Sequence, residues 1–200
     1  MRVYCKSVLL FFVVLVLVMR ANIVFSEDHE IYVIEGERSF LSGWPATEGE
    51  FVNVVIEIPA GSVDKWEVRK SDGALAWEIN KGSYRKVKYL PYPANYGMVP
   101  RTLLPKSLGG DGDPLDVIVL GPAIVRGSVV SVTVIGVLKL LDHGEQDDKL
   151  IAILKGSDFD GLSNMSSLGE NFKGVKEILA LWFENYKGPG KMEVLEFAGA

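Results

Sequence analysis

The 200-residue sequence is poor in the side chains that build covalent cross-links or soft-metal sites. Its single cysteine, Cys5, excludes an internal disulfide framework. Only two histidines occur, His29 and His143, which disfavours a zinc enzyme built on imidazoles. Basic residues are not in excess, because 21 Lys and Arg stand against 26 Asp and Glu, and this argues against nucleic acid as the main partner. A metal site would depend on carboxylates, which favour hard ions such as Mg²⁺ or Mn²⁺.

Signs of disorder and of repeated architecture are also missing. Hydrophobic residues make up 48% of the chain and charged residues 24%, which excludes wholesale disorder. The sequence has no internal repeat and no low-complexity linker. We therefore expect one folded domain over residues 51–200, preceded by a polar N-terminal arm over residues 27–50.

The first 26 residues contain no Asp or Glu and carry a basic start. The segment from Val8 to Met19 is an unbroken apolar run, shorter than the about 20 residues that a transmembrane helix needs. This order is typical of a secretory signal peptide. We expect an exported protein, periplasmic or secreted, whose mature chain starts near Glu27. The alternatives are an uncleaved membrane anchor, or a cytoplasmic protein if this segment is not a signal.

Residue patterns predict mostly strands, since β-branched or alternating segments recur along the chain. Strands are expected at residues 31–34, 51–58, 65–69, 74–79, 115–120, 128–141, 149–154 and 192–197. The turn signal Ser71-Asp72-Gly73 predicts that residues 65–69 and 74–79 form a hairpin. Residues 89–101 carry three prolines and are expected to form a rigid irregular loop.

Only one segment has strong helical periodicity. Apolar residues between Phe172 and Tyr186 recur at spacings of three and four, and Gly188-Pro189-Gly190 ends the pattern. Many strands with one amphipathic C-terminal helix predict a mainly β fold with flanking helices (α+β), in which the helices pack outside a small barrel.

The most informative motif is an acidic cluster at residues 109–117. Asp111, Asp113 and Asp116 place three carboxylates within six residues at the junction of a glycine-containing loop and a strand. Such charges repel one another at close range, so the cluster is either solvated or holds cations. An EF-hand loop needs Gly at its sixth position and Glu at its twelfth. Counted from Asp111, these positions hold Asp116 and Pro122, so an EF-hand is excluded. An aspartyl-nucleophile phosphatase is disfavoured because the apolar strand follows the cluster.

Other polar groups are ambiguous when each is taken alone. Residues 141–149 read as a charged hairpin loop, and Lys65 with Glu67 as a surface ion pair on one strand face. The remaining cations and phenols are scattered: Arg85, Tyr92, Tyr96, Tyr186 and Lys187. Together, acidic clusters for several cations and Lys, Arg and Tyr donors indicate a site for a polyanionic phosphate.

These residues resemble the soluble, metal-dependent inorganic pyrophosphatase family. Residues 111–117, DGDPLDV, match its signature. The resemblance runs from about Val52 to Tyr186 through four further segments: 55–67, 92–97, 136–149 and 183–187. It implies an OB-like closed five-stranded barrel, Mg²⁺ as cofactor with several ions per site (Mn²⁺ as an alternative), and a homo-oligomer without another stable protein partner.

The resemblance also implies roles for single residues. The metal ligands would be Asp111, Asp116, Asp142, Asp147, Glu57 and Glu67. Phosphate oxygens would be bound by Lys65, Arg85, Tyr96, Lys149, Tyr186 and Lys187, with Tyr92 in support. Asp113 would be the general base or would orient the attacking water.

The expected activity is hydrolysis of inorganic pyrophosphate to two orthophosphates by metal-activated water. Neither a Ser nor a Cys nucleophile is required. Two alternatives use the same scaffold: an exported protein that binds polyanions or divalent cations without catalysis, and a hydrolase of a larger phosphoanhydride.

Overall fold

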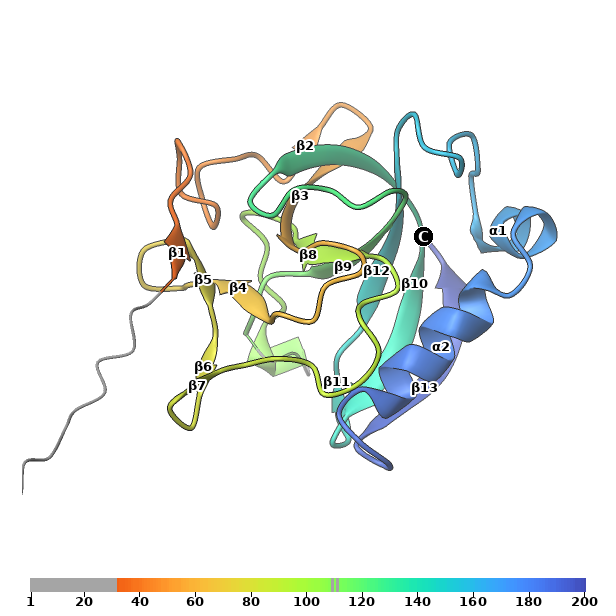
Figure 1. Cartoon of the computed structure of the whole chain (residues 1–200). Coiled ribbons are helices and arrows are strands. Elements are labelled where there is room, and N and C mark those ends of the chain that lie inside the picture. The colour runs from red at the N-terminus through yellow and green to blue at the C-terminus, as the bar shows by residue number, and fades with distance from the viewer. Residues whose placement is uncertain (1–31, 109, 111) are drawn as a thin grey trace, which may run out of the picture.

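The computed structural model describes residues 32–200 except 109 and 111 (Figure 1). The expectations for residues 1–26, and the predicted ligand Asp111, lie outside the described residues. The strands are β1 (Val33–Ile34), β2 (Thr47–Glu48), β3 (Phe51–Ile58), β4 (Trp66–Val68), β5 (Leu75–Trp77), β6 (Ile79–Asn80), β7 (Ser83–Tyr84), β8 (Asn95–Met98), β9 (Asp116–Leu120), β10 (Val129–Asp142), β11 (Glu145–Gln146), β12 (Lys149–Leu154) and β13 (Met192–Gly199). The helices are α1 (Met165–Asn171), α2 (Val175–Asn185) and the 3₁₀ turn η1 (Lys106–Leu108).

The main sheet is built around β10. Its strand order is β11-β10-β12-β9-β8-β3-β2, and β3 also pairs with β10, so the pairings lead from β10 through β12, β9, β8 and β3 back to β10. All these pairs are antiparallel except β12 with β9, which is parallel. A smaller sheet, β1-β5-β4, and the hairpin β6-β7 lie beside it. The fold is therefore mainly β with flanking helices, as the sequence predicts.

The length and bend of β10 let it join so many partners. Its N-terminal part pairs with β3, and its C-terminal part pairs with β13 on one edge and β12 on the other. The register against β12 shifts between Val134 and Gly136. Gly136 is required there, because a Cβ atom would lie 2.3 Å from Cγ of Met165. This irregularity bends the strand around the core.

Helix α2 covers the face of the sheet formed by β10 and β13 (Figure 1). Its apolar face buries Leu179, Trp182 and Phe183 in the largest core cluster. Apolar residues at spacings of three and four form this face, as the sequence predicts. The predicted helix is therefore confirmed, but it begins at Val175 rather than at Phe172. Among the described residues, no helix has the length and apolar character needed to cross a membrane.

Two parts of the fold differ from the sequence-based expectation. The structure contains a second helix, α1, which has only two buried apolar residues and is stabilised by a capping box between Asn164 and Ser167. The proline-containing segment 89–101, predicted to be an irregular loop, contains the buried strand β8. Gly97 lets β8 approach β3, because a Cβ atom there would lie 1.8 Å from the carbonyl oxygen of Val55.

Asn95 fastens β8 to two loops. Its side chain is fully buried and makes four hydrogen bonds. Oδ1 accepts from the backbone N–H groups of Ala60 (3.1 Å) and Ile124 (2.8 Å). Nδ2 donates to the carbonyl oxygens of Val119 (3.3 Å) and Pro122 (2.9 Å).

We expect Asn95→Ala to lower the free energy of unfolding by about 3 kcal/mol or more, because it leaves several buried backbone groups without partners. Urea denaturation followed by tryptophan fluorescence measures the change. The matched control is Asn80→Ala, at an exposed position, which should shift stability by less than about 0.5 kcal/mol. Equal midpoints for the two variants would contradict this assignment.

Candidate active site

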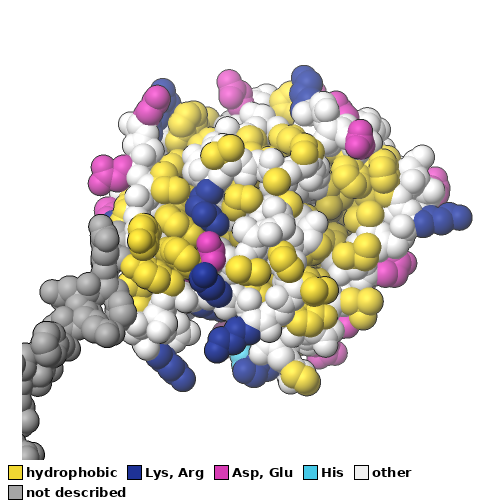
Figure 2. All heavy atoms as spheres, viewed as in Figure 1, with side chains coloured by type: hydrophobic (Ala, Val, Ile, Leu, Met, Phe, Trp, Pro, Cys, Tyr) yellow, Lys and Arg dark blue, Asp and Glu magenta, His cyan; other side chains and the backbone are white. Residues whose placement is uncertain are grey.

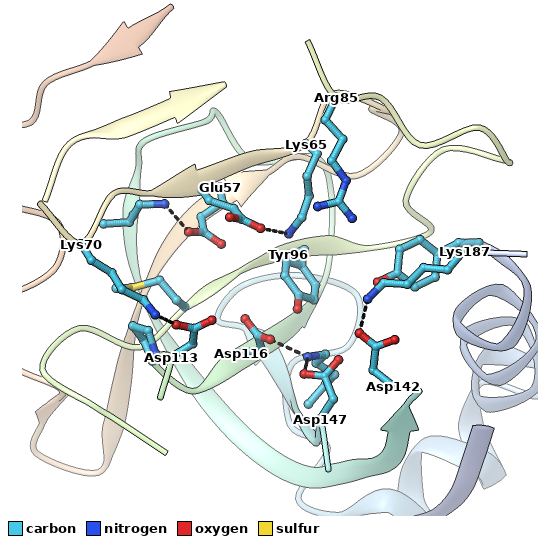
Figure 3. A pocket seen from close by; sticks show the side chains of 16 residues that line it. Glu57, Lys65, Lys70, Arg85, Tyr96, Asp113, Asp116, Asp142, Asp147 and Lys187 are labelled. Atoms are coloured by element: carbon cyan, nitrogen blue, oxygen red, sulfur yellow. Dashed lines mark hydrogen bonds and ion pairs between the residues drawn. The ribbon is translucent and has the colours of Figure 1, made fainter. Parts of the chain in front are cut away.

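A polar cavity of about 240 Å³ opens where one end of the main sheet meets β4 and the end of α2 (Figure 3). It is lined by Glu57, Lys65, Glu67, Val68, Lys70, Arg85, Tyr96, Met98, Asp113, Pro114, Asp116, Asp142, Asp147, Lys149, Tyr186 and Lys187. With two exceptions, every residue predicted for the site lines this cavity. Asp111 lies outside the described residues, and Tyr92 lies in the core beneath, with its ring centroid 4.4 Å from that of Trp182.

Sheet topology explains why residues so far apart in sequence meet here. The parallel register between β12 and β9 places Lys149 directly beside Asp116. Asp142 is the last residue of β10, and Asp147 follows the tight β10–β11 hairpin. Strand ends thus bring the acidic signature and the acidic hairpin to one edge of the sheet.

Lys149 is the most buried cation of the cavity, with its side chain only 3% exposed. Its Nζ lies 2.5 Å from Oδ2 of Asp116 and also pairs with Asp147. Burial opposes the charge of Lys149, but Asp116 and Asp147 outweigh it and raise the pKa of the ammonium. Burial raises the pKa of Asp147 despite the attraction of Lys149. One lysine therefore holds two carboxylates together.

Lys187 and Asp142 form a second pair across the cavity. Nζ of Lys187 lies 2.5 Å from Oδ2 of Asp142, and Nδ1 of His143 lies 2.7 Å from Oδ1. Burial would raise the pKa of Asp142, but its hydrogen bond and attraction to Lys187 hold that pKa below the usual value. The Asp142 carboxyl is therefore an ionised oxygen donor at neutral pH.

The pair Lys65–Glu67 differs from its expectation as a surface ion pair. Its N–O distance is 2.9 Å, and Glu67 is half exposed, but the Lys65 side chain is only 12% exposed and points into the cavity (Figure 3). A surface pair was expected because strand alternation shows which residues share a face, not what covers that face. Burial raises the pKa of the Glu57 carboxyl to about 8. The attraction of Lys65 and a hydrogen bond from the Val68 N–H lower this pKa, but burial outweighs them.

The phenols of the cavity remain hydrogen-bond donors at neutral pH. Burial, aided by Asp116, raises the pKa of Tyr96 well above its ordinary value, and burial likewise raises that of Tyr186. Arg85 keeps its charge beside Glu78, with N–O distances of 2.8 and 2.7 Å. These donors face the same space as Lys65 and Lys187, so they can bind anionic oxygens together.

Sequence reasoning missed Lys70. Its Nζ pairs with Oδ1 of Asp113 and lies 3.3 Å from the carbonyl oxygen of Gly112 (Figure 3). Lys70 stands immediately before the predicted turn Ser71-Asp72-Gly73, where an exposed lysine is ordinary. No local signal placed this turn against the acidic signature.

The donor set fits a hard divalent cation. The ionisable ligands facing the cavity are carboxylates, the oxygen ligands that Mg²⁺ and Mn²⁺ prefer. In the described part of the chain, no three Asp, Glu, His or Cys side chains stand close enough together to hold an ion as placed. Lysines are interleaved with the carboxylates, as Lys149 is between Asp116 and Asp147.

Comparisons with known proteins agree on one family. The family model described as inorganic pyrophosphatase matches residues 54–200. An inorganic pyrophosphatase of Gluconobacter oxydans is 40% identical over 137 residues, 68% of this chain and 73% of that protein. One of Xylella fastidiosa is 37% identical over 152 residues, 75% of this chain and 80% of that protein.

Solved structures support the same relationship. The inorganic pyrophosphatase of Thermus thermophilus superposes with a TM-score of 0.67 at 29% identity, over 80% of this chain and 90% of that one. That of Helicobacter pylori gives 0.65 at 32% identity, over 78% and 89%. With the family model covering most of the chain, these matches establish that the protein belongs to the inorganic pyrophosphatase family.

Proposed function

We propose that this chain hydrolyses inorganic pyrophosphate to two orthophosphates in the cavity described above. The observation that carries the proposal is that carboxylates, lysines, an arginine and tyrosine hydroxyls converge on one small polar cavity in a member of this family. The non-catalytic binding alternative is not favoured, because Asp113 faces the same cavity. Replacement of pyrophosphate by a larger phosphoanhydride as the main substrate is not favoured either.

In the proposed mechanism, basic side chains and tyrosine hydroxyls of the cavity hold the substrate. They bind phosphate oxygens, and the basic side chains neutralise the charge of the transferred group. These residues are Lys65, Arg85, Tyr96, Lys149, Tyr186 and Lys187. Phosphoryl transfer needs such positioning and charge stabilisation more than covalent chemistry. Asp113 accepts the proton of the attacking water, and Lys70 holds the Asp113 carboxylate toward the cavity.

We further propose Mg²⁺ as the cofactor, with Mn²⁺ as an alternative. Divalent cations would supply Lewis acidity and lower the pKa of water. The carboxylates that would hold these cations are Asp111, Asp116, Asp142, Asp147, Glu57 and Glu67. The hard-oxygen donor set supports this assignment. By family analogy we also propose an OB-type barrel for the ring of strand pairings and a homo-oligomeric assembly.

Asp116→Asn tests the metal assignment. We expect turnover to fall at least about 100-fold, since electrostatic groups that act on the transition state are worth this much. Phosphate release at saturating magnesium measures the loss, and circular dichroism checks folding. The matched control is Asp148→Asn, which changes a neighbouring carboxylate that does not line the cavity. Turnover close to wild type in Asp116→Asn would remove this residue from the site.

We propose that the protein is exported and that its first 26 residues are removed. The basic start and short apolar run support this proposal. Protein purified from the native host should begin at or near Glu27 and should fractionate with the periplasm or the medium. N-terminal sequencing with cell fractionation checks this. An intact Met1 on soluble cytoplasmic protein would contradict export, and an intact Met1 on membranes would indicate an anchor.

A further inference from the structure

Arg85 reaches the catalytic cavity from an element that belongs to neither of the larger sheets. It directly follows β7 in the hairpin β6-β7, which forms a two-stranded sheet of its own (Figure 1). Such a hairpin has little stability by itself. The Arg85 guanidinium nevertheless lies beside Lys65 in the cavity (Figure 3). Its position therefore depends on the contacts that tie this hairpin to β4 and β5.

The main chain of Arg85 takes part in three such contacts. Its N–H donates to the carbonyl oxygen of Glu78 at 2.7 Å. Its carbonyl oxygen accepts two hydrogen bonds, one from the backbone N–H of Lys65 at 3.0 Å and one from Nε1 of Trp77 at 2.9 Å. The indole of Trp77, on β5, thus holds the carbonyl group of a residue whose guanidinium lines the cavity.

Aromatic neighbours fix the orientation of the Trp77 indole. It stacks with Trp66 at a centroid distance of 5.8 Å and with Tyr84 at 4.7 Å. Tyr32 packs against Trp77 and Tyr84 and is half exposed, so the stack ends at the surface. Figure 2 shows hydrophobic side chains gathered there, over β1 and β5. The stack leaves the indole little freedom, which keeps its N–H directed at the Arg85 carbonyl.

Stacking does not by itself require an indole N–H at this position. Trp66 belongs to the same stack, yet its buried Nε1 has no hydrogen-bond partner in the part of the chain that the structure describes. Trp77 does not line the catalytic cavity, so it does not touch the substrate there. Its hydrogen bond to Arg85 is the contact through which it can affect the site.

We propose that Trp77 is a positioning residue for pyrophosphate binding, which holds the main chain of Arg85 so that the guanidinium stays directed into the catalytic cavity. This inference rests on the proposed function, because it requires Arg85 to bind phosphate oxygens. A guanidinium that is already in place loses less conformational freedom when it meets phosphate. Loss of the indole N–H therefore weakens substrate binding and leaves the steps after binding nearly unchanged.

Trp77→Phe tests this role, because phenylalanine keeps an aromatic ring in the stack but lacks the N–H. Steady-state kinetics with pyrophosphate at constant free Mg²⁺ gives both constants. We expect KM to rise about 3- to 10-fold, the effect of losing one hydrogen bond. We expect kcat to change less than about 2-fold, as for a loss of uniform binding. Trp77→Tyr also lacks the indole N–H and should show the same rise in KM.

A double-mutant cycle determines whether Trp77 acts through Arg85. Arg85→Met should raise KM by itself. Adding Trp77→Phe to that variant should raise KM by less than about a further 2-fold, since no guanidinium remains to be positioned. A full additional effect of Trp77→Phe in the Arg85→Met background would overturn the inference, because Trp77 would then act by another route.

The matched control is Trp44→Phe, the same substitution in the N-terminal arm. Trp44 lies outside the cavity, and its Nε1 has no hydrogen-bond partner among the described residues, so KM should not change. A merely structural role of Trp77 would reduce the folded fraction, which lowers apparent kcat at unchanged KM.

An unchanged KM in Trp77→Phe overturns the inference and leaves the proposed function standing. Failure of both Trp77 variants to fold, measured by circular dichroism, also overturns it, because Trp77 would then be a structural residue. A folded wild-type chain that does not cleave pyrophosphate with Mg²⁺ overturns both proposals.

Discussion

Asp113→Asn is expected to lower kcat for pyrophosphate by about 10²–10⁴-fold while leaving Mg²⁺ affinity close to wild type. The amide keeps the shape of the side chain but cannot accept a proton from water. Asp113 faces the catalytic cavity, and its partner Lys70 holds it from the turn that follows β4. Steady-state kinetics over a range of magnesium concentrations separates turnover from metal affinity.

The control for Asp113→Asn is Asp158→Asn, which changes an exposed carboxylate outside the cavity and should retain wild-type kinetics. A large weakening of magnesium binding, with turnover restored at saturating metal, would make Asp113 a ligand rather than a base. The same experiment on Lys70→Met indicates how far the orientation of the carboxylate matters, because that variant retains the base.

Removal of divalent cations is expected to abolish pyrophosphate hydrolysis completely, and added Mg²⁺ should restore it. The cavity offers carboxylate oxygens for a hard cation. Ca²⁺ should bind but inhibit, because it prefers more ligands at longer distances than Mg²⁺. Activity assays with excess chelator, followed by titration with each ion, measure these effects.

Circular dichroism after chelation provides the control for metal removal, since the described fold is built on a sheet and a core that do not require the carboxylates of the cavity. An unfolded protein after chelation would give the metal a structural role instead. Full hydrolysis of pyrophosphate in excess chelator would contradict metal assistance altogether.

Local patterns predicted those elements that carry their own signal. The β-branched segment Phe51–Ile58 forms β3 with the expected bounds, and Lys149–Leu154 forms β12 likewise. The helical periodicity placed α2 to within three residues of its start. In each case one face or a whole run is buried, so hydrophobicity and β-propensity agree with the final packing.

Elements that depend on distant partners could not be predicted in this way. Strand β8 lies among prolines and forms because β3 and β9 pair with it on both sides. Helix α1 is short and has only Met165 and Leu168 buried, which leaves too little periodicity to recognise. Tertiary contacts decide both elements.

The candidate site shows the same division between local and distant information. Asp113 and Asp116 formed a recognisable motif, but residue patterns alone left the groups around Lys65 and Asp142 as ordinary surface features. Their gathering depends on the register of Lys149 against Asp116, which no single segment encodes. Resemblance to a family supplies this long-range information for the predicted site residues. Lys70 lies outside the segments that carry the resemblance, so its contact with Asp113 could not be predicted.

The most direct test of the central claim is phosphate release from pyrophosphate by the purified full chain, with and without Mg²⁺, beside Asp116→Asn prepared in parallel. The account predicts two orthophosphates per pyrophosphate with Mg²⁺, no release without it, and a loss of at least about 100-fold in the variant. No phosphate release by the folded wild-type chain with Mg²⁺, or equal rates in wild type and variant, would contradict it.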